Sequence, residues 1–178
     1  MKTFALIGVF ALASVLIAGS GTVVAGERVN PESTVEEWVK AKRLKVDEKD
    51  SGCKTLTHFA AEEGRIDALE WLKEQDVDLN AKDNFGAVPM YWAAEHGQTE
   101  TMQWLKEQGV DVNAKNKWGQ TPMHMATRGV SIRTMQWLKE NGADVNAKDN
   151  EGKTPLQYAE EYDYRKDTAE WLKANGAE

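Results

Sequence analysis

The chain repeats itself with a period of about 33 residues. The segments NAKDNFG at 80–86, NAKNKWG at 113–119 and NAKDNEG at 146–152 recur at that spacing. The tryptophans follow the same period, at Trp38, Trp71, Trp104, Trp137 and, after one extra residue, Trp171. A unit this short cannot bury an apolar face alone, so neighbouring units must stack on one another. The period therefore predicts a solenoid.

The third copy ends in a sequence that is typical of nucleotide sites. Gly152-Lys153-Thr154 matches the end of a phosphate-binding loop, which would indicate an NTPase or a kinase. Such a loop needs a glycine where Ala147 stands and a strand that leads into it, and the sequence offers neither. The repeat explains these residues as the third copy of a turn, which argues against a nucleotide site.

Alignment on the period gives four units, at 50–82, 83–115, 116–148 and 149–178. Each carries a related motif (TLTHFAA, VPMYWAA, TPMHMAT, TPLQYAE), and a Trp-Leu pair follows. This pattern closely resembles the ankyrin repeat family, whose unit is a β-turn plus two antiparallel helices. The resemblance implies an all-α solenoid with β-turn fingers. Residues 27–49, with Trp38 in register, are expected to form a degenerate N-terminal capping unit.

The residues themselves are consistent with this fold. Thr121 and Thr154 can cap the first helix of their units, and a proline follows each at the first helical position, where a missing N–H costs nothing. The Trp-Leu pair of each second helix is expected to fill the space between stacked units. On this basis, replacing Trp104 or Trp137 by alanine should cost about 3–5 kcal/mol.

No catalytic or metal-binding pattern emerges, so we expect neither an enzyme nor a cofactor. The resemblance implies that His58 and His124 tie adjacent turns by hydrogen bonds, and neither has a second ligand at zinc spacing. The single cysteine, Cys53, stands where the family has a turn glycine and excludes an intrachain disulfide. Leu56 and Val88 also depart from the motif, which questions the regularity of the first two turns.

Residues 1–25 have the layout of a secretory signal peptide, with Lys2, an apolar run and then small residues. The alternative is an uncleaved anchor in the inner membrane, since the uncharged stretch from Phe4 to Gly26 is long enough to span a bilayer, which takes roughly 20 residues. Either way, we expect an exported chain, periplasmic or secreted and of bacterial origin. The net charge of the chain is −7, and the acidic excess from residue 50 onward argues against binding to nucleic acid or anionic lipid.

The resemblance implies binding through the finger tips and the concave face of the first helices. Candidate contact residues lie at these tips and in the turns after the first helices. Phe85 and Trp118 are the strongest candidates, because large aromatic side chains anchor interfaces. The alternative is that they pack on neighbouring tips. The full set is Asn84, Phe85, Ala87, Glu95, Lys117, Trp118, Gln120, Arg128, Asn150, Glu151 and Lys153.

The predicted function is that of a monomeric, non-enzymatic scaffold that binds another protein outside the cytoplasm. The turns after the first helices are mostly acidic, which favours a partner with a basic patch. No small-molecule substrate is expected. The alternative is a membrane-tethered adaptor or a secreted effector that acts on a host protein.

Overall fold

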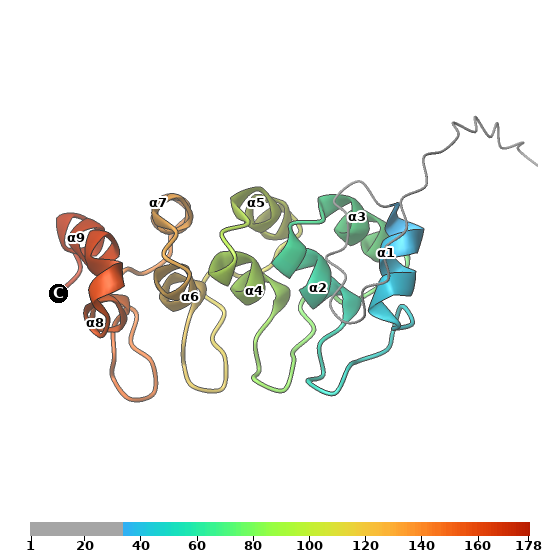
Figure 1. The fold of residues 1–178 in the computed structure, drawn as a ribbon, viewed down its shortest axis with the longest axis horizontal. Coiled ribbons are helices and arrows are strands. Elements are labelled where there is room, and N and C mark those ends of the chain that lie inside the picture. Colours follow the sequence, from blue (N-terminus) through green and yellow to red (C-terminus); the bar gives the residue numbers. More distant parts are fainter. Residues whose placement is uncertain (1–33) are drawn as a thin grey trace, which may run out of the picture.

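The computed structural model describes residues 34–178, which form a linear array of helix pairs with loops projecting from one side (Figure 1). Between residues 34 and 178 there are helices and no strands, as expected for an all-α solenoid. The helices are α1 (Val35–Lys42), α2 (Leu56–Glu63), α3 (Ile66–Glu74), α4 (Pro89–Glu95), α5 (Thr99–Glu107), α6 (Pro122–Arg128), α7 (Ile132–Glu140), α8 (Pro155–Glu160) and α9 (Lys166–Ala174), and the 3₁₀ turn η1 (Asp163–Arg165) precedes α9.

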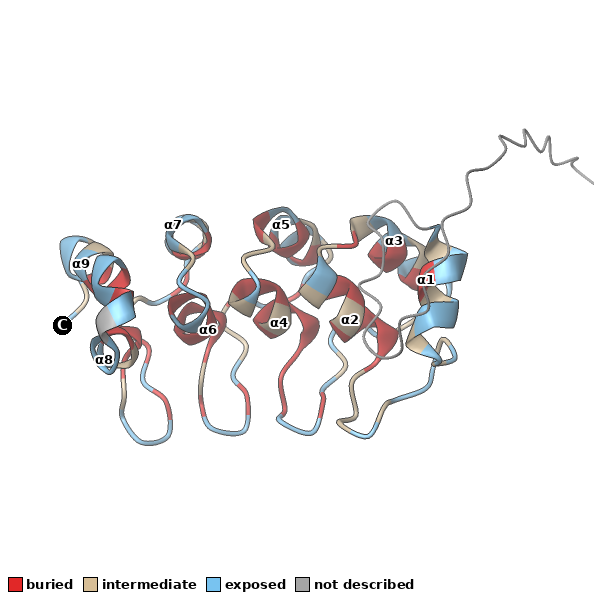
Figure 2. Ribbon diagram, in the orientation of Figure 1, coloured by how far each residue is buried: buried red, intermediate tan, exposed pale blue. Residues whose placement is uncertain are grey.

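The helices form two rows. The first helices of the units, α2, α4, α6 and α8, pack side by side in one row, and each contacts its own second helix in the other row (Figure 1). Buried residues lie where the rows and successive units meet, whereas exposed residues cover the outside of the array (Figure 2). Ala60, Ala61, Ala93 and Ala94 are fully buried, and their short side chains let the first helices approach closely.

The first helices begin at the predicted capping residues. The Thr154 backbone N–H donates to Gln157 Oε1 (2.9 Å), and the Gln157 N–H donates back to Thr154 Oγ1 (3.4 Å). The Thr121 N–H donates to His124 Nδ1 (3.1 Å) in the same way. Pro122 and the corresponding proline of α8 occupy the first helical turn. These capping contacts confirm the predicted helix starts.

A carboxylate or amide organises each finger. Asp83 Oδ1 accepts hydrogen bonds from the backbone N–H groups of Phe85 (2.8 Å) and Ala87 (2.9 Å). The same contacts recur at Asp50, Asn116 and Asp149. Because two backbone N–H groups point at one oxygen, the chain folds back into a tight loop. The β-turn fingers are thus built by local hydrogen bonds.

Neighbouring fingers are joined by one backbone hydrogen bond each. The Lys117 N–H donates to the Phe85 carbonyl oxygen (2.9 Å), and the Asn150 N–H donates to the Trp118 carbonyl oxygen (2.8 Å). An equivalent bond runs from the Asn84 N–H to Gly52. The tips therefore form a continuous row in which side chains of adjacent units lie next to each other.

The Trp-Leu pairs behave differently from the prediction. The leucines of these pairs, such as Leu105 and Leu138, are fully buried, whereas the tryptophans beside them pack against the core while remaining partly exposed. Trp137 Nε1, for example, donates to Gln103 Oε1 (3.1 Å) of the preceding unit. Adjacent helical residues point about 100° apart, so in these pairs the tryptophan lies at the edge while the leucine points into the core. Leucine, not tryptophan, fills it.

The turns stay regular where the sequence departs from the motif. Cys53 has a φ of 56°, the left-handed conformation that Gly86 adopts at the same position of the next unit (71°). Val130 likewise has a φ of 58° at the position where Gly97 has 72°. Non-glycine residues are strained in this region. The tertiary structure imposes the turn on both residues.

The predicted signal peptide, residues 1–25, lies outside the described residues. The unit boundaries and the capping role of 27–49 stay predictions, although α1 lies in the latter segment and its Trp38 is fully buried. Among residues 34–178, no helix has the length and apolar character needed to span a membrane.

Candidate functional site

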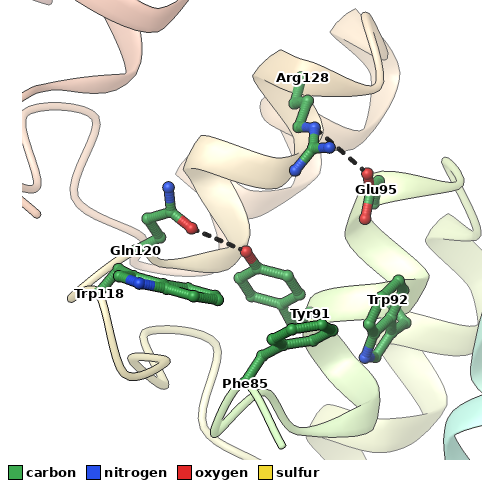
Figure 3. Close-up of a pocket in the computed structure, with 7 residues that line it drawn as sticks. All are labelled: Phe85, Tyr91, Trp92, Glu95, Trp118, Gln120 and Arg128. Carbon is green, nitrogen blue, oxygen red and sulfur yellow. Dashed lines mark hydrogen bonds and ion pairs between the residues drawn. The ribbon is translucent and has the colours of Figure 1, made fainter. Parts of the chain in front are cut away.

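A pocket of about 230 Å³ opens between the second and third fingers and the helices α4 and α6 behind them (Figure 3). Four aromatic rings, a carboxylate, a guanidinium and an amide line it. We call it the aromatic pocket, and its residues are Phe85, Tyr91, Trp92, Glu95, Trp118, Gln120 and Arg128. Five of these seven residues belong to the contact set predicted from the sequence.

Phe85 and Trp118 form the outer wall of the pocket. Their ring centroids lie 5.5 Å apart with a tilt of 33°, so the two tips pack on each other. Their exposed fractions are nevertheless 44% and 51%. The two rings therefore pack on neighbouring tips, which was the alternative to binding. About half of each side chain nevertheless remains available to a partner.

A hydrogen-bond chain fixes the floor of the pocket. The Tyr91 hydroxyl donates to Gln120 Oε1 (3.0 Å) and accepts from Asn116 Nδ2 (2.9 Å). Gln120 Nε2 donates to the Tyr158 hydroxyl (2.7 Å), which donates to Asp149 Oδ2 (2.8 Å). Burial raises the pKa of the Tyr91 hydroxyl, which keeps it protonated as a donor. The side chain of Gln120 thus joins three units.

The far end of the pocket is charged. Glu95 and Arg128 terminate α4 and α6, and the Arg128 Nε lies 3.5 Å from the Glu95 Oε1 (Figure 3). The Arg128 side chain is 58% exposed. Aromatic walls with an ion pair at one end can hold a side chain that is both apolar along its length and polar at its tip.

Sequence reasoning missed Tyr91 and Trp92. Trp92 is held in place because its Nε1 donates to Asp83 Oδ2 (2.9 Å). The sequence held one signal for Tyr91, because it occupies the position that His58 and His124 occupy in other units. A tyrosine there cannot make the histidine's capping contacts, and its hydroxyl contacts the side chain of Gln120 in the next finger.

The other predicted tip residues fall into three groups. Lys117 and Glu151 are exposed at the tips. Asn84 and Asn150 are exposed too, but their side chains tie fingers together by donating to the carbonyl oxygens of Ser51 (3.2 Å) and Lys117 (2.9 Å). Lys153 forms an ion pair within its own repeat, with Nζ 2.6 Å from Glu161 Oε1.

Ala87 was predicted to be a contact residue at a tip, and this prediction is wrong. Its side chain is 1% exposed. Its N–H donates to Asp83 Oδ1, and its carbonyl oxygen accepts from His58 Nε2 (3.1 Å). These two bonds place Ala87 at the base of the finger, where a methyl group is covered by its surroundings.

The two motif histidines are structural, as the resemblance implies. His58 and His124 are fully buried, and each Nδ1 accepts a backbone N–H, from Thr55 and Thr121 (3.1 Å each). Each Nε2 donates to a carbonyl oxygen of the next finger, at Ala87 (3.1 Å) or Lys153 (3.2 Å). Burial lowers the pKa of both rings more than these carbonyls raise it. In the part of the chain described, no group of acidic, histidine or cysteine side chains could hold a metal.

Stacked helix pairs with tied fingers define a class of protein, the α-solenoids built from repeats. A family model described as "Ankyrin repeats (3 copies)" matches residues 24–116 and 90–178, so the chain belongs to the ankyrin repeat family. A comparison with curated proteins gave no significant match. Ankyrin repeats are in general protein–protein interaction modules and typically not enzymes.

Proposed function

We propose that this chain is a non-enzymatic scaffold that binds a partner protein through the aromatic pocket and the finger tips beside it. One observation carries the proposal: Phe85 and Trp118 pack on each other at neighbouring tips while about half of each side chain remains exposed. Aromatic side chains in such positions contribute strongly to binding. The hydrogen-bonded floor adds to this, because a pocket that is already ordered loses little entropy when a partner binds.

The charge of the surface supports a basic partner. The net charge of the chain is −7, with the acidic excess from residue 50 onward, although Glu62, Glu95 and Glu161 after the first helices each pair with a cation of the chain itself. Opposite charges across an interface raise the association rate, and salt screens them. Binding should therefore weaken as the salt concentration rises. Equal affinity at low and high salt would contradict the electrostatic part of the proposal.

The proposed site of action is outside the cytoplasm, in the periplasm or beyond the cell. The layout of residues 1–25 supports export, and a bacterial source fits an exported chain with one cysteine. The alternative is an adaptor that stays anchored in the inner membrane or a secreted effector that acts on a host protein. Cell fractionation with the intact mass of the recovered chain separates a cleaved, released chain from an anchored one.

The experiment that tests binding is a pull-down with the full chain and two double variants. In the site variant, Phe85 and Trp118 become alanine. In the control, Tyr162 and Tyr164 become alanine; these two exposed rings also lie 5.5 Å apart, but outside the pocket. The bait proteins are matched for melting temperature before use.

We expect the control and the wild type to retain the same partner and the site variant to lose it. Two central aromatic anchors should together contribute at least about 2 kcal/mol, which is roughly a thirtyfold change in Kd. A partner that binds the site variant as well as the wild type would refute the proposed surface.

A further inference from the structure

Two of the four repeats hold an ammonium group of their own at the same place. In the first repeat, Lys54 Nζ lies 2.7 Å from Glu62 Oε2, and in the last, Lys153 Nζ lies 2.6 Å from Glu161 Oε1. In both, a lysine from the base of the finger reaches a carboxylate eight residues later, where the first helix ends.

Aromatic rings complete these ammonium sites. Lys54 Nζ lies 3.3 Å from the ring centroid of Trp92 and 5.4 Å from that of Phe59. Lys153 Nζ lies 5.6 Å from the ring centroid of Tyr158. A cation close to an aromatic ring is attracted by the negative potential of the ring face. Each of these lysines thus pairs with a carboxylate of its own repeat and lies near an aromatic ring.

The second repeat has the ring and the carboxylate but not the lysine. Trp92 and Glu95 occupy the positions that Phe59 and Glu62 hold in the first repeat, whereas Ala87 occupies the position of Lys54. The aromatic pocket lies beside Trp92 and Glu95, on the side of the third repeat. The methyl group of Ala87 is too short to bring a charge to this place, so the second repeat has no lysine of its own beside Trp92 and Glu95.

The charge of Glu95 is only weakly neutralised by the third repeat, which supplies Arg128 in place of an acid. Its Gln120 and Arg128 occupy the positions of the lysine and the carboxylate, so this repeat has no acid of its own there. The Arg128 Nε approaches Glu95 only to 3.5 Å, whereas the lysine contacts of the first and last repeats are 2.7 and 2.6 Å long. The Arg128 side chain is mostly exposed and can move away.

We propose that the aromatic pocket binds a lysine side chain of the partner protein. Its ammonium pairs with Glu95, as Lys54 and Lys153 pair with the carboxylates of their own repeats, and it lies beside the Trp92 ring that Lys54 also contacts. Its methylene stem packs on Phe85 and Trp118, because lysine stems cover apolar surface while the charge stays in a polar place. This inference rests on the proposed function and names the chemistry that the pocket recognises.

The test uses a phage-displayed library of random 12-residue peptides selected on the full-length wild-type chain. Recovered peptides are synthesised with each lysine in turn replaced by norleucine, which keeps the stem and removes the charge. Binding is measured to the wild type, to Ala87→Lys, whose new lysine should fill the pocket from within, and to Glu95→Gln, which keeps the shape of the pocket. Melting temperatures identify any variant that does not fold, and Glu95→Gln then carries the test alone.

We expect the peptides to share one lysine whose replacement by norleucine weakens binding at least about tenfold. Both protein variants should weaken binding of the parent peptide by a similar factor and should not discriminate between lysine and norleucine.

Three results would overturn the inference: peptides that bind without a lysine, peptides with an acidic residue that binds Arg128 in its place, and no binding peptide at all. The double variant Phe85→Ala/Trp118→Ala tests the role of the tips independently of the lysine. If lysine-free peptides still need these two rings, the lysine inference fails and the proposed function stands; if no peptide needs them, both fail.

Discussion

The two buried histidines should make this fold sensitive to mild acid. His58 and His124 each accept a backbone N–H at Nδ1 and donate from Nε2 to the next finger. Both ring nitrogens are therefore engaged in the neutral form, and a proton added at Nδ1 would break the capping contact. Because burial lowers the pKa of both rings, the unfolded chain takes up protons at a higher pH than the folded chain.

Proton linkage gives both the sign and the size of the effect of pH on the free energy of unfolding. The histidine pKa in an unfolded chain is about 6.5, so the free energy of unfolding is highest above that pH and falls as the pH drops toward the lower pKa of the folded state. Each histidine contributes a slope of at most about 1.4 kcal/mol per pH unit, so the two together contribute about 2.7. The carboxyl groups whose pKa is lowered, Asp67, Glu100 and Asp149, lose their contribution only below about pH 5.

The assay is urea unfolding followed by far-UV circular dichroism at pH 7.5, 6.5 and 5.5. We expect little change between the first two values and a loss of more than about 1 kcal/mol between the last two. The control is His58→Gln/His124→Gln, because Gln157 makes the same capping contacts in the last repeat and does not titrate. The control should be less stable at pH 7.5 and nearly independent of pH. A wild-type stability that stays flat down to pH 5.5 would refute the reasoning.

Two further stability predictions follow from the backbone and the core. Cys53→Gly and Val130→Gly should each raise the free energy of unfolding by about 0.5–1 kcal/mol, because glycine removes the strain of a left-handed φ and loses part of that gain as entropy; a fall in melting temperature would contradict this. Leu105→Ala should cost about 3–5 kcal/mol in urea unfolding, whereas Trp104→Ala should fall below that range because its ring is partly in water. A loss under about 1 kcal/mol for Leu105→Ala would show that the leucine does not fill the core.

Most of the fold could be predicted from the sequence because the repeat encodes it locally. The capping residues, the first-turn prolines and the Asx residue that begins each finger all act within a short stretch of the chain, as Asp83 shows with Phe85 and Ala87. Such contacts have the same outcome in every copy. The short period of the repeat then leaves stacking as the way to bury the apolar faces.

The site could be predicted only in part. The row of tips and the aromatic pair were expected, but Ala87 was placed at a tip when it lies at the base of the finger. Tyr91 and Trp92 were overlooked, since their position in the motif suggested only helix packing. Whether a Trp-Leu pair buries one residue or both was also undecidable, because that depends on how far the second helices rotate against their neighbours.

The sequence by itself determined the repeat, the turn chemistry, the acidic surface and the exclusion of a phosphate loop, since each depends on residue types at fixed local spacing. Tertiary structure alone decided the aromatic pocket. Its walls come from neighbouring repeats whose residues meet only when the repeats stack, as Phe85 meets Trp118 and Tyr91 meets Gln120. The significance of Ala87 could also be recognised only in three dimensions. Lys54, at the equivalent position of the first repeat, shows which carboxylate and ring a longer side chain would reach.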